Sequence, residues 1–279
     1  MRLATFNILH GRSPGDGTVD LDRYAAAIRR LDADVLALQE VDDDQPRSHH
    51  ADLTAVAAAA MGAVDHRFAA TLVGLPDVWT AATGEGELAS GRYGIALLSR
   101  LPVQRWRALR LPQLDRPVPV RFPGHTNPVM VEDEPRTALV AEVRSPDGVL
   151  TVAATHLTFI PSWNDRQLVR LVRDVLAGPV DGAARDGAAH DAAVHDRDPA
   201  TRPTRPAVVM GDLNLHPPHP ERLTGWTALA AGATFPAHAP TEQLDHVLGH
   251  GPVRATGPAR SVDLGLSDHR ALVVDVALG

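Results

Sequence analysis

Two residue types that often carry covalent chemistry are missing from this sequence. It contains no cysteine, which excludes thiol nucleophiles, cysteine metal sites and disulfide bonds. It also contains no lysine, so every basic residue is an arginine. A Schiff base and a phosphate-binding P-loop both require lysine, and both are therefore excluded. The groups left for catalysis are mainly carboxylates, imidazoles and carboxamides.

Aromatic residues, basic runs and long apolar runs are also scarce. Aromatics make up 4% of the 279 residues, so the core must consist mainly of Ala, Val, Leu and Ile. The net charge is −7, and without a long basic run we do not expect tight, non-specific binding to duplex nucleic acid. Charges interrupt every apolar run, and the first residues lack the apolar region of a signal peptide. We therefore predict a cytoplasmic protein without a membrane span, and a monomer without a stable partner.

Short apolar runs of strand length recur along the chain, and several are continuous, which is typical of strands covered on both faces. They comprise residues 3–6, 34–38, 95–98, 137–143, 150–155, 207–210 and 271–276. Apolar residues have helical spacing in 21–31, after Asp20 as a candidate N-cap, and in 164–176. An Ala-rich helix is predicted over 51–61, ending before Gly62. This alternation predicts a layered α/β domain with mixed or antiparallel sheets packed face to face and helices outside.

We expect one domain over residues 1–279, interrupted by two irregular segments. Residues 111–135 are rich in Pro, Gly and charge, and we predict a long surface loop there. Residues 178–206 are of low complexity and poor in apolar side chains, which predicts a mobile insertion. His190 and His195 lie in this insertion, and without ordered surroundings they are poor candidates for metal ligands.

Polar side chains stand at the ends of the apolar strands. They are Asn7, Gln39, Glu40, His156, Asp212, Asn214, Asp245, Asp268 and His269. A single residue of this kind usually makes a turn or a cap, but strand ends of layered α/β proteins converge and hold side chains rigidly. Carboxylate oxygens suit Mg²⁺, and imidazole and carboxamide donors suit phosphate oxygens. The set therefore predicts metal-assisted hydrolysis of a phosphate ester.

The motifs that contain these residues resemble, in order and spacing, those of the endonuclease/exonuclease/phosphatase superfamily. They read TFNILHG (5–11), LALQEVD (36–42), YGIALLSR (93–100), ATHL (154–157), VVMGDLN (208–214), LDHVL (244–248) and SDHRAL (267–272). Each motif alone is weak, but the set runs from residue 3 to residue 276. The resemblance implies a DNase I-like four-layer α/β sandwich, in which two packed mixed β-sheets are flanked by helices. It also implies a divalent-metal site for Mg²⁺, with Mn²⁺ as the alternative.

The resemblance further implies roles for residues at the metal and at the attacking water. Glu40 would be the principal Mg²⁺ ligand, Asn7 beside it would contact metal or phosphate, and Asp268 would lie near the metal. Asp212 would orient or deprotonate the water. Asn214 would hydrogen-bond the nucleophile or the scissile phosphate.

A second group of residues is implied to hold the phosphate. His269 would bind a phosphate oxygen as a charged donor, because Asp245 beside it favours the protonated imidazole. His156 would be the second imidazole on the phosphate. Arg136 matches a position where the family often has a basic residue near the phosphate, and Tyr93 is a further candidate contact.

Most of these residues also have an ordinary structural interpretation. Asn7 and Asn214 are of a type common in turns, and Asp245 could cap a turn. Arg136 could lie on the surface, and Tyr93 could pack at the start of a strand. These alternatives stay open on the sequence alone.

The chain departs from the family's pattern at two positions. Ile95 stands where the family often has an Asn that supports the site. Leu9 stands where members acting on abasic DNA often carry an Asp, and the place of His156 also differs from that branch. The differences at Leu9 and His156 argue against an abasic-site repair enzyme. His246 follows Asp245 and is expected to point to the opposite face of its strand.

The substrate remains open between a nucleic acid, a lipid and a small molecule. A nuclease needs a basic groove, for which the candidates are Arg100, Arg105, Arg107 and Arg110. Such a strip is also typical of an exposed edge strand. A lipid phosphodiesterase needs an exposed apolar loop, for which Trp79, Trp163 and residues 159–160 are candidates. A small-molecule phosphatase needs neither feature, and the acidic net charge suits it.

Two other functions compete with a metal-dependent phosphoesterase of this family. A catalytically inactive binding or scaffold protein on the same fold predicts that a key residue is missing, and none is missing. A two-metal phosphoesterase of a different fold would need more histidines in bridging spacing.

Overall fold

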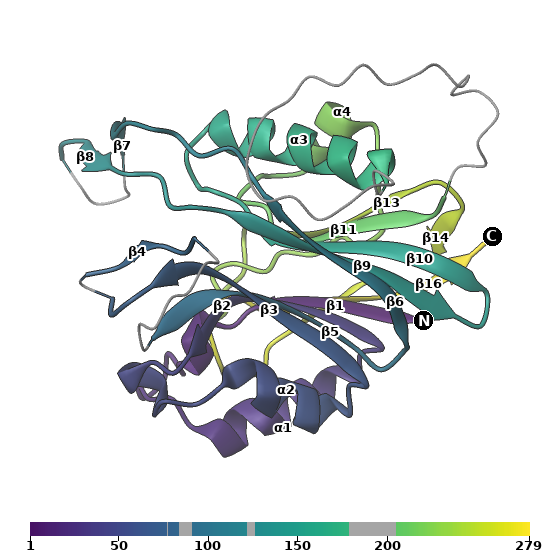
Figure 1. Ribbon diagram of the computed structural model, residues 1–279, viewed down its shortest axis with the longest axis horizontal. Coiled ribbons are helices and arrows are strands. Elements are labelled where there is room, and N and C mark those ends of the chain that lie inside the picture. The colour runs from purple at the N-terminus through teal and green to yellow at the C-terminus, as the bar shows by residue number, and fades with distance from the viewer. Residues whose placement is uncertain (77, 84–90, 122–125, 179–204) are drawn as a thin grey trace.

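A computed structural model describes residues 1–76, 78–83, 91–121, 126–178 and 205–279. Two large β-sheets pack face to face, and helices cover the outer face of each sheet (Figure 1). The four-layer α/β sandwich expected from the sequence is confirmed. Within the described part of the chain, every helix is too short or too polar to cross a membrane.

The first sheet has eight strands in the order β14-β16-β1-β2-β5-β3-β4, with β15 paired to β16. Its strands are β1 (Arg2–Asn7), β2 (Val35–Asp43), β3 (Asp65–Val73), β4 (Thr80–Ala81), β5 (Arg92–Ser99), β14 (Val253–Ala255), β15 (Arg260–Val262) and β16 (Ala271–Leu278). Only the central pair β1–β2 is parallel among its neighbours. The sheet is therefore mixed, which is one of the two arrangements that the sequence predicted.

The second sheet has six strands in the order β12-β13-β11-β10-β9-β6. They are β6 (Val103–Arg110), β9 (Thr137–Ser145), β10 (Gly148–His156), β11 (Ala207–Asp212), β12 (Thr227–Ala228) and β13 (Asp245–His250). Here β10 and β11 form the parallel pair, and the other neighbours are antiparallel. The two sheets thus have a similar arrangement, in which one parallel pair of strands lies near the centre.

The two irregular segments have different outcomes. The prediction of a loop over residues 111–135 was wrong in part, because β7 (Val118–Val120) and β8 (Val129–Val131) form a small antiparallel sheet there. β-branched valines stand opposite one another in this pair, which favours strand pairing over coil. The predicted insertion 178–206 lies almost entirely outside the described residues, and so do His190 and His195.

The helices begin and end at residues whose chemistry explains their bounds. α1 (Leu21–Leu31) begins after Asp20, whose carboxylate accepts the backbone N–H groups of the first turn, as predicted. α2 (Leu53–Met61) begins after Asp52 rather than at residue 51, because that carboxylate caps it, and it ends at the left-handed Gly62. α3 (Trp163–Ala177) ends before Gly178, and the short α4 is His219–Thr224. Two short 3-10 turns are η1 (Leu9–Gly11) and η2 (Pro46–Ser48).

The alternation of side chains along the strands separates three apolar layers. Leu3 belongs to the core between the sheets, whereas Ala4 and Phe6 belong to the layer that packs against α1 and α2. A third layer packs α3 against the second sheet. Because successive side chains alternate, Asn7 at the end of β1 points between the sheets, on the same side as Leu3.

Gly211 lets β10 and β11 approach closely beside the strand end at Asp212. A Cβ at this position would lie 1.9 Å from the carbonyl oxygen of Thr155, which is backbone and cannot yield. We therefore expect Gly211→Ala to lower the free energy of unfolding by about 3 kcal/mol, measured from urea unfolding curves. The control is Gly257→Ala, where an added Cβ meets nothing within 4 Å. Equal unfolding midpoints for the two variants would contradict the close approach of the two strands.

Candidate active site

The polar strand ends meet at one end of the two sheets. In the first sheet, Asn7 stands beside Gln39 in the parallel pair β1–β2. In the second sheet, His156 pairs with Asp212 across β10–β11, and Asp212 pairs with Asp245 across β11–β13. The amide of Asn7 joins the sheets by donating to the carboxylate of Asp212. The convergence expected from the sequence is therefore present.

Glu40 reaches this site because β2 contains a β-bulge. The register of β2 against β5 shifts between Leu38 and Val41, and both of these side chains pack in the layer of α1 and α2. In a regular strand Glu40, two residues after Leu38, would face that helical layer as well. The bulge gives Glu40 a left-handed backbone with φ of 58° and reverses its side chain. Its Oε1 consequently accepts a hydrogen bond of 3.1 Å from Asn7 Nδ2.

Asp212 lies at the centre of the site, with polar groups around it from both sheets. Its Oδ2 accepts a hydrogen bond of 3.1 Å from Asn7 Nδ2. The same oxygen lies 3.6 Å from His156 Nε2 and 3.8 Å from His269 Nε2. Its Oδ1 accepts the backbone N–H of Asn214 at 3.0 Å. The carboxylate is therefore held from several directions, with only 2% of the residue exposed.

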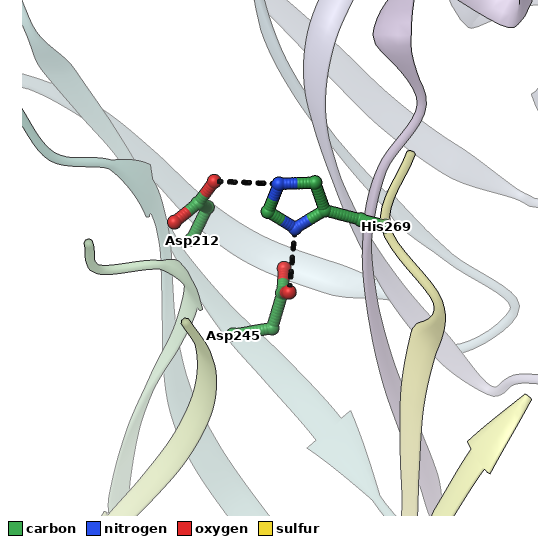
Figure 2. A group of neighbouring side chains, drawn as sticks. All are labelled: Asp212, Asp245 and His269. Atoms are coloured by element: carbon green, nitrogen blue, oxygen red, sulfur yellow. Dashed lines mark hydrogen bonds and ion pairs between the residues drawn. The ribbon is translucent and has the colours of Figure 1, made fainter. Parts of the chain in front are cut away.

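His269 lies between two aspartates, as Figure 2 shows. Its Nδ1 is 2.9 Å from Oδ2 of Asp245, a fully buried residue, and its Nε2 faces Asp212. The ring of Phe235 packs against the imidazole with 5.0 Å between centroids. The other oxygen of Asp245, Oδ1, is buried and has no hydrogen-bond partner among the described residues. The imidazole is thus fixed in orientation by one carboxylate and one aromatic ring.

Electrostatics gives His269 and Asp212 unusual protonation behaviour. Burial by itself lowers the pKa of His269, but Asp245, Asp212 and Asp268 together raise this pKa to about 10. Burial, followed by the charge of Asp245, raises the pKa of Asp212 to about 7. At neutral pH His269 is therefore a cation, and Asp212 has a pKa in the range suited to accepting a proton.

Arg136 and His156 complete the side of the site formed by the second sheet. Arg136 is 7% exposed, and its Nη2 donates to Glu134 Oε2 at 3.1 Å. Its Nε is buried, and no group in the described part of the chain accepts from it. Burial, followed by the positive charges of Arg136 and His269, lowers the pKa of His156 well below its usual value. The site thus contains a neutral imidazole beside a buried guanidinium with an unused N–H, an arrangement suited to an oxyanion.

Three other predicted residues lie at the edges of this group. Tyr93 begins the inner face of β5, and burial followed by the charge of Glu40 raises its pKa well above the usual value. Asn214 has a left-handed backbone with φ of 51°, and its Nδ2 donates to the carbonyl of Leu157 at 2.9 Å. Asp268 is half-buried and close enough to Glu40 to raise the pKa of that carboxyl. The chemical roles of all these residues stay predictions.

The donor set favours a metal at Glu40 rather than at the imidazole. Among the described residues, ligand atoms of Asp212, Asp245 and His269 lie within 4.8 Å of one another. A protonated imidazole has no free lone pair, so the raised pKa of His269 argues against a metal in that group. Burial and the neighbouring Asp268 both raise the pKa of Glu40, so two carboxylates repel each other there. A divalent cation with oxygen ligands would relieve this repulsion, and the residues therefore fit Mg²⁺.

Two positions noted in the sequence lie away from the reacting groups. Ile95 is 2% exposed and packs in the core between the sheets, so an apolar contact replaces the polar support common in the family. His246 faces away from Asp245, as predicted, and its Nε2 lies 2.8 Å from the carbonyl oxygen of Leu215.

Several side chains beside the site carry no signal in the sequence. Phe235, which packs on His269, and Arg47, which lies over the ring of Trp79, belong to segments far apart in the chain. No spacing pattern marks such contacts.

His10, in the first motif, has a left-handed backbone, and burial followed by the charge of Arg47 lowers its pKa to about 4.

Similar folds occur in several solved structures. The chain aligns over its full length with 72% of an endonuclease/exonuclease/phosphatase from Beutenbergia cavernae, with 25% identity and a TM-score of 0.69. It also aligns over its full length with the whole of a mannosyl-6-phosphatase from Bacteroides thetaiotaomicron, with 13% identity and a TM-score of 0.61. The human nocturnin catalytic domain is matched over 94% of its length and 100% of this chain, with 16% identity and a TM-score of 0.59.

Sequence comparison gives the family directly. No curated protein matches the chain with statistical significance. The sequence model of the endonuclease/exonuclease/phosphatase family, however, matches residues 4–269. This match covers the first six motifs in full and the last motif as far as His269. The chain belongs to the endonuclease/exonuclease/phosphatase family.

Proposed function

We propose that this protein hydrolyses a phosphoester with the help of a divalent cation, and that Asp212 assists the attack of water. Members of the family are usually hydrolases of phosphoester bonds. The observation that supports the finer proposal is the buried carboxylate of Asp212 with Asn7, His156 and His269 around it. A carboxylate with a pKa of about 7 is suited to accept the proton of an attacking water.

The phosphate would lie between the cationic and neutral donors of the site. His269 offers a charged N–H at Nε2, and Asp245 holds the ring by Nδ1. Arg136 offers the buried Nε that has no partner, and His156 offers a neutral imidazole. Donors fixed in advance in this way stabilise the charge that grows on phosphate oxygens in the transition state.

Glu40 and Asp268 are the residues proposed to hold Mg²⁺, with Mn²⁺ as the alternative. A bound cation would act as a Lewis acid on a phosphate oxygen and would lower the pKa of a coordinated water. The chain's own contribution is to hold the carboxylates, since Asn7 Nδ2 donates to both Glu40 Oε1 and Asp212 Oδ2 at 3.1 Å. Asn7 therefore fixes the position of Glu40, the proposed metal ligand, relative to Asp212, which would act on the water.

Two of the four arginines that could have lined a nucleic-acid groove donate to other groups of the chain. Arg100 pairs with Asp32 at 2.7 Å and donates to the carbonyl of Met61. Arg107 donates to the carbonyl groups of Asp174 and Gly178. Three of the four belong to β6, which stands at the edge of its sheet. These contacts favour the interpretation of the strip as a charged edge strand, and with the acidic net charge they favour a small substrate.

The proposed function is tested by removing and restoring the metal. We expect the purified protein to hydrolyse at least one ester in a panel of aryl phosphates, sugar phosphates, mononucleotides, single-stranded DNA and sphingomyelin. A chelator should reduce this rate by at least about 100-fold, and Mg²⁺ or Mn²⁺ should restore it. Turnover that is indifferent to the chelator would exclude the metal. No turnover of any ester under either metal would instead favour an inactive binding protein on this fold.

A further inference from the structure

An aromatic and cationic cluster, made of Arg47, Trp79 and Tyr93, stands beside the site, and the proposed reaction uses neither Arg47 nor Trp79. The rings of Trp79 and Tyr93 meet edge to face, with 4.9 Å between their centroids and 83° between their planes. The guanidinium carbon of Arg47 lies 5.2 Å from the centroid of Trp79 and 5.4 Å from that of Tyr93. The three side chains therefore form one compact group.

The bulge in β2 connects this cluster to the reacting groups. Because the bulge reverses Glu40, Asp42 two residues later also leaves the helical layer, and it is completely buried. Asp42 holds Arg47 in a bidentate pair, with bonds of 2.8 Å to Nε and 2.7 Å to Nη2. Asp42 is also the register partner of Tyr93 on β5. The cluster thus begins at Tyr93, next to Glu40, and continues through Arg47 and Trp79.

Two hydrogen-bond donors of this cluster have no partner in the described part of the chain. The indole Nε1 of Trp79 is buried and unpaired. Arg47 uses Nε and Nη2 on Asp42, and its Nη1 makes no hydrogen bond to the described residues. The side chain of Arg47 is 28% exposed. Asp42 holds the guanidinium of Arg47 rigidly, while its Nη1 and the indole Nε1 lack an acceptor among the described residues. Because a buried donor such as Nε1 is normally paired, this indicates a binding surface rather than a closed structural cluster.

We propose that Arg47 and Trp79 bind the organic part of the substrate, and that this part is a hydroxylated ring such as that of a sugar phosphate. This inference rests on the proposed function, since the phosphate must lie at His269, Arg136 and His156. A sugar ring presents C–H groups that pack on an aromatic face and oxygens that accept from Nη1 and Nε1. An extended lipid chain would leave these two donors unpaired, because it carries no acceptor. A nucleic-acid backbone would need a basic strip.

The test compares a cyclic with an acyclic substrate of similar polarity. Glucose 6-phosphate and sorbitol 6-phosphate carry the same phosphate, but only the first forms a ring. We expect Trp79→Ala to raise KM for glucose 6-phosphate about tenfold with little change in kcat, and KM for sorbitol 6-phosphate less than about twofold. Inhibition by inorganic phosphate should not change, because phosphate occupies only the reacting groups.

Matched variants separate binding from folding. Trp163→Ala removes a similar indole, which lies 4.7 Å from Arg166 on α3, and it should leave the preference for the ring intact. Trp79→Phe keeps an aromatic face without the N–H and should fall between wild type and Trp79→Ala. Arg47→Lys keeps the charge but loses the bidentate pair, and it should also weaken binding of glucose 6-phosphate.

Direct binding makes this inference testable even without turnover. Calorimetry with glucose 6-phosphate, sorbitol 6-phosphate and inorganic phosphate gives Kd for each variant. Equal weakening of all three by Trp79→Ala would show a purely structural role and overturn the proposal. A Trp79-dependent preference for adenosine monophosphate over glucose 6-phosphate would assign a nucleobase and overturn the sugar. If the wild type binds glucose 6-phosphate through Trp79 but hydrolyses no ester, the proposed reaction fails while this binding site stands.

Discussion

Asp212→Asn is expected to reduce kcat by roughly 10³-fold, a larger effect than we expect from any other single substitution in the site. Asparagine has nearly the same shape as aspartate, and its oxygen can still accept from Asn7 Nδ2. It cannot accept a proton from water. The raised pKa of Asp212 shows that burial of its charge is costly, so a neutral replacement should not destabilise the fold. Steady-state kinetics on the best substrate, with urea unfolding of both proteins, measures the two effects separately.

The control for this variant is Asp147→Asn. Asp147 is exposed in the turn between β9 and β10, at the opposite end of β10 from His156. It should turn over substrate at the wild-type rate. If Asp212→Asn also retained more than about a tenth of wild-type kcat, proton transfer to Asp212 would not be part of the rate-limiting chemistry.

Glu40→Gln is expected to have the second largest effect, through the metal rather than through the proton. The amide is a much weaker ligand for a hard cation than the carboxylate. We expect the Mg²⁺ concentration for half-maximal activity to rise by at least about tenfold and kcat to fall about 100-fold. Because burial already disfavours the charged form of Glu40, the variant should unfold no more easily than wild type.

Calorimetric titration with Mg²⁺ distinguishes this loss from a general disturbance. Glu142→Gln is the matched control, because Glu142 stands opposite Thr151 on β10, well before the strand end at His156. Its Mg²⁺ affinity should equal that of wild type. Unchanged Mg²⁺ affinity in Glu40→Gln would mean that the cation binds elsewhere. The group of Asp212, Asp245 and His269 would then be the next candidate.

The site combines groups that serve function at the expense of the stability of the fold. Within the described ranges, one oxygen of the fully buried Asp245 and the buried Nε of Arg136 are unpaired. Glu40 and Asn214 have left-handed backbones. Each of these features costs stability in the free protein. A phosphate oxygen could accept from Arg136 Nε and supply its missing partner, so a bound phosphate should stabilise the protein against unfolding.

Much of the fold follows from local features of the sequence. The start of α1 depends on Asp20, which caps the first turn through its own carboxylate, and the end of α2 depends on Gly62. Continuous apolar runs predicted the central strands, because both faces of each sheet are covered. The composition of segment 111–135 is that of a loop and predicts coil. Its two short strands pair with each other across a separation in sequence that the composition does not reveal.

The candidate site residues were likewise visible in the sequence, because acids, amides and imidazoles follow one another in a recognisable order at the strand ends. Their mutual arrangement was decided by the tertiary structure. Simple alternation from Leu38 places Glu40 on the helical side of its sheet, and only the bulge, formed against a strand distant in the sequence, brings it to Asn7. The pairing of Arg47 with Trp79 also depends on packing between distant segments. Helix caps and turns depend on neighbouring residues and can be predicted from them. Strand register and contacts between distant segments are fixed only when the sheets assemble.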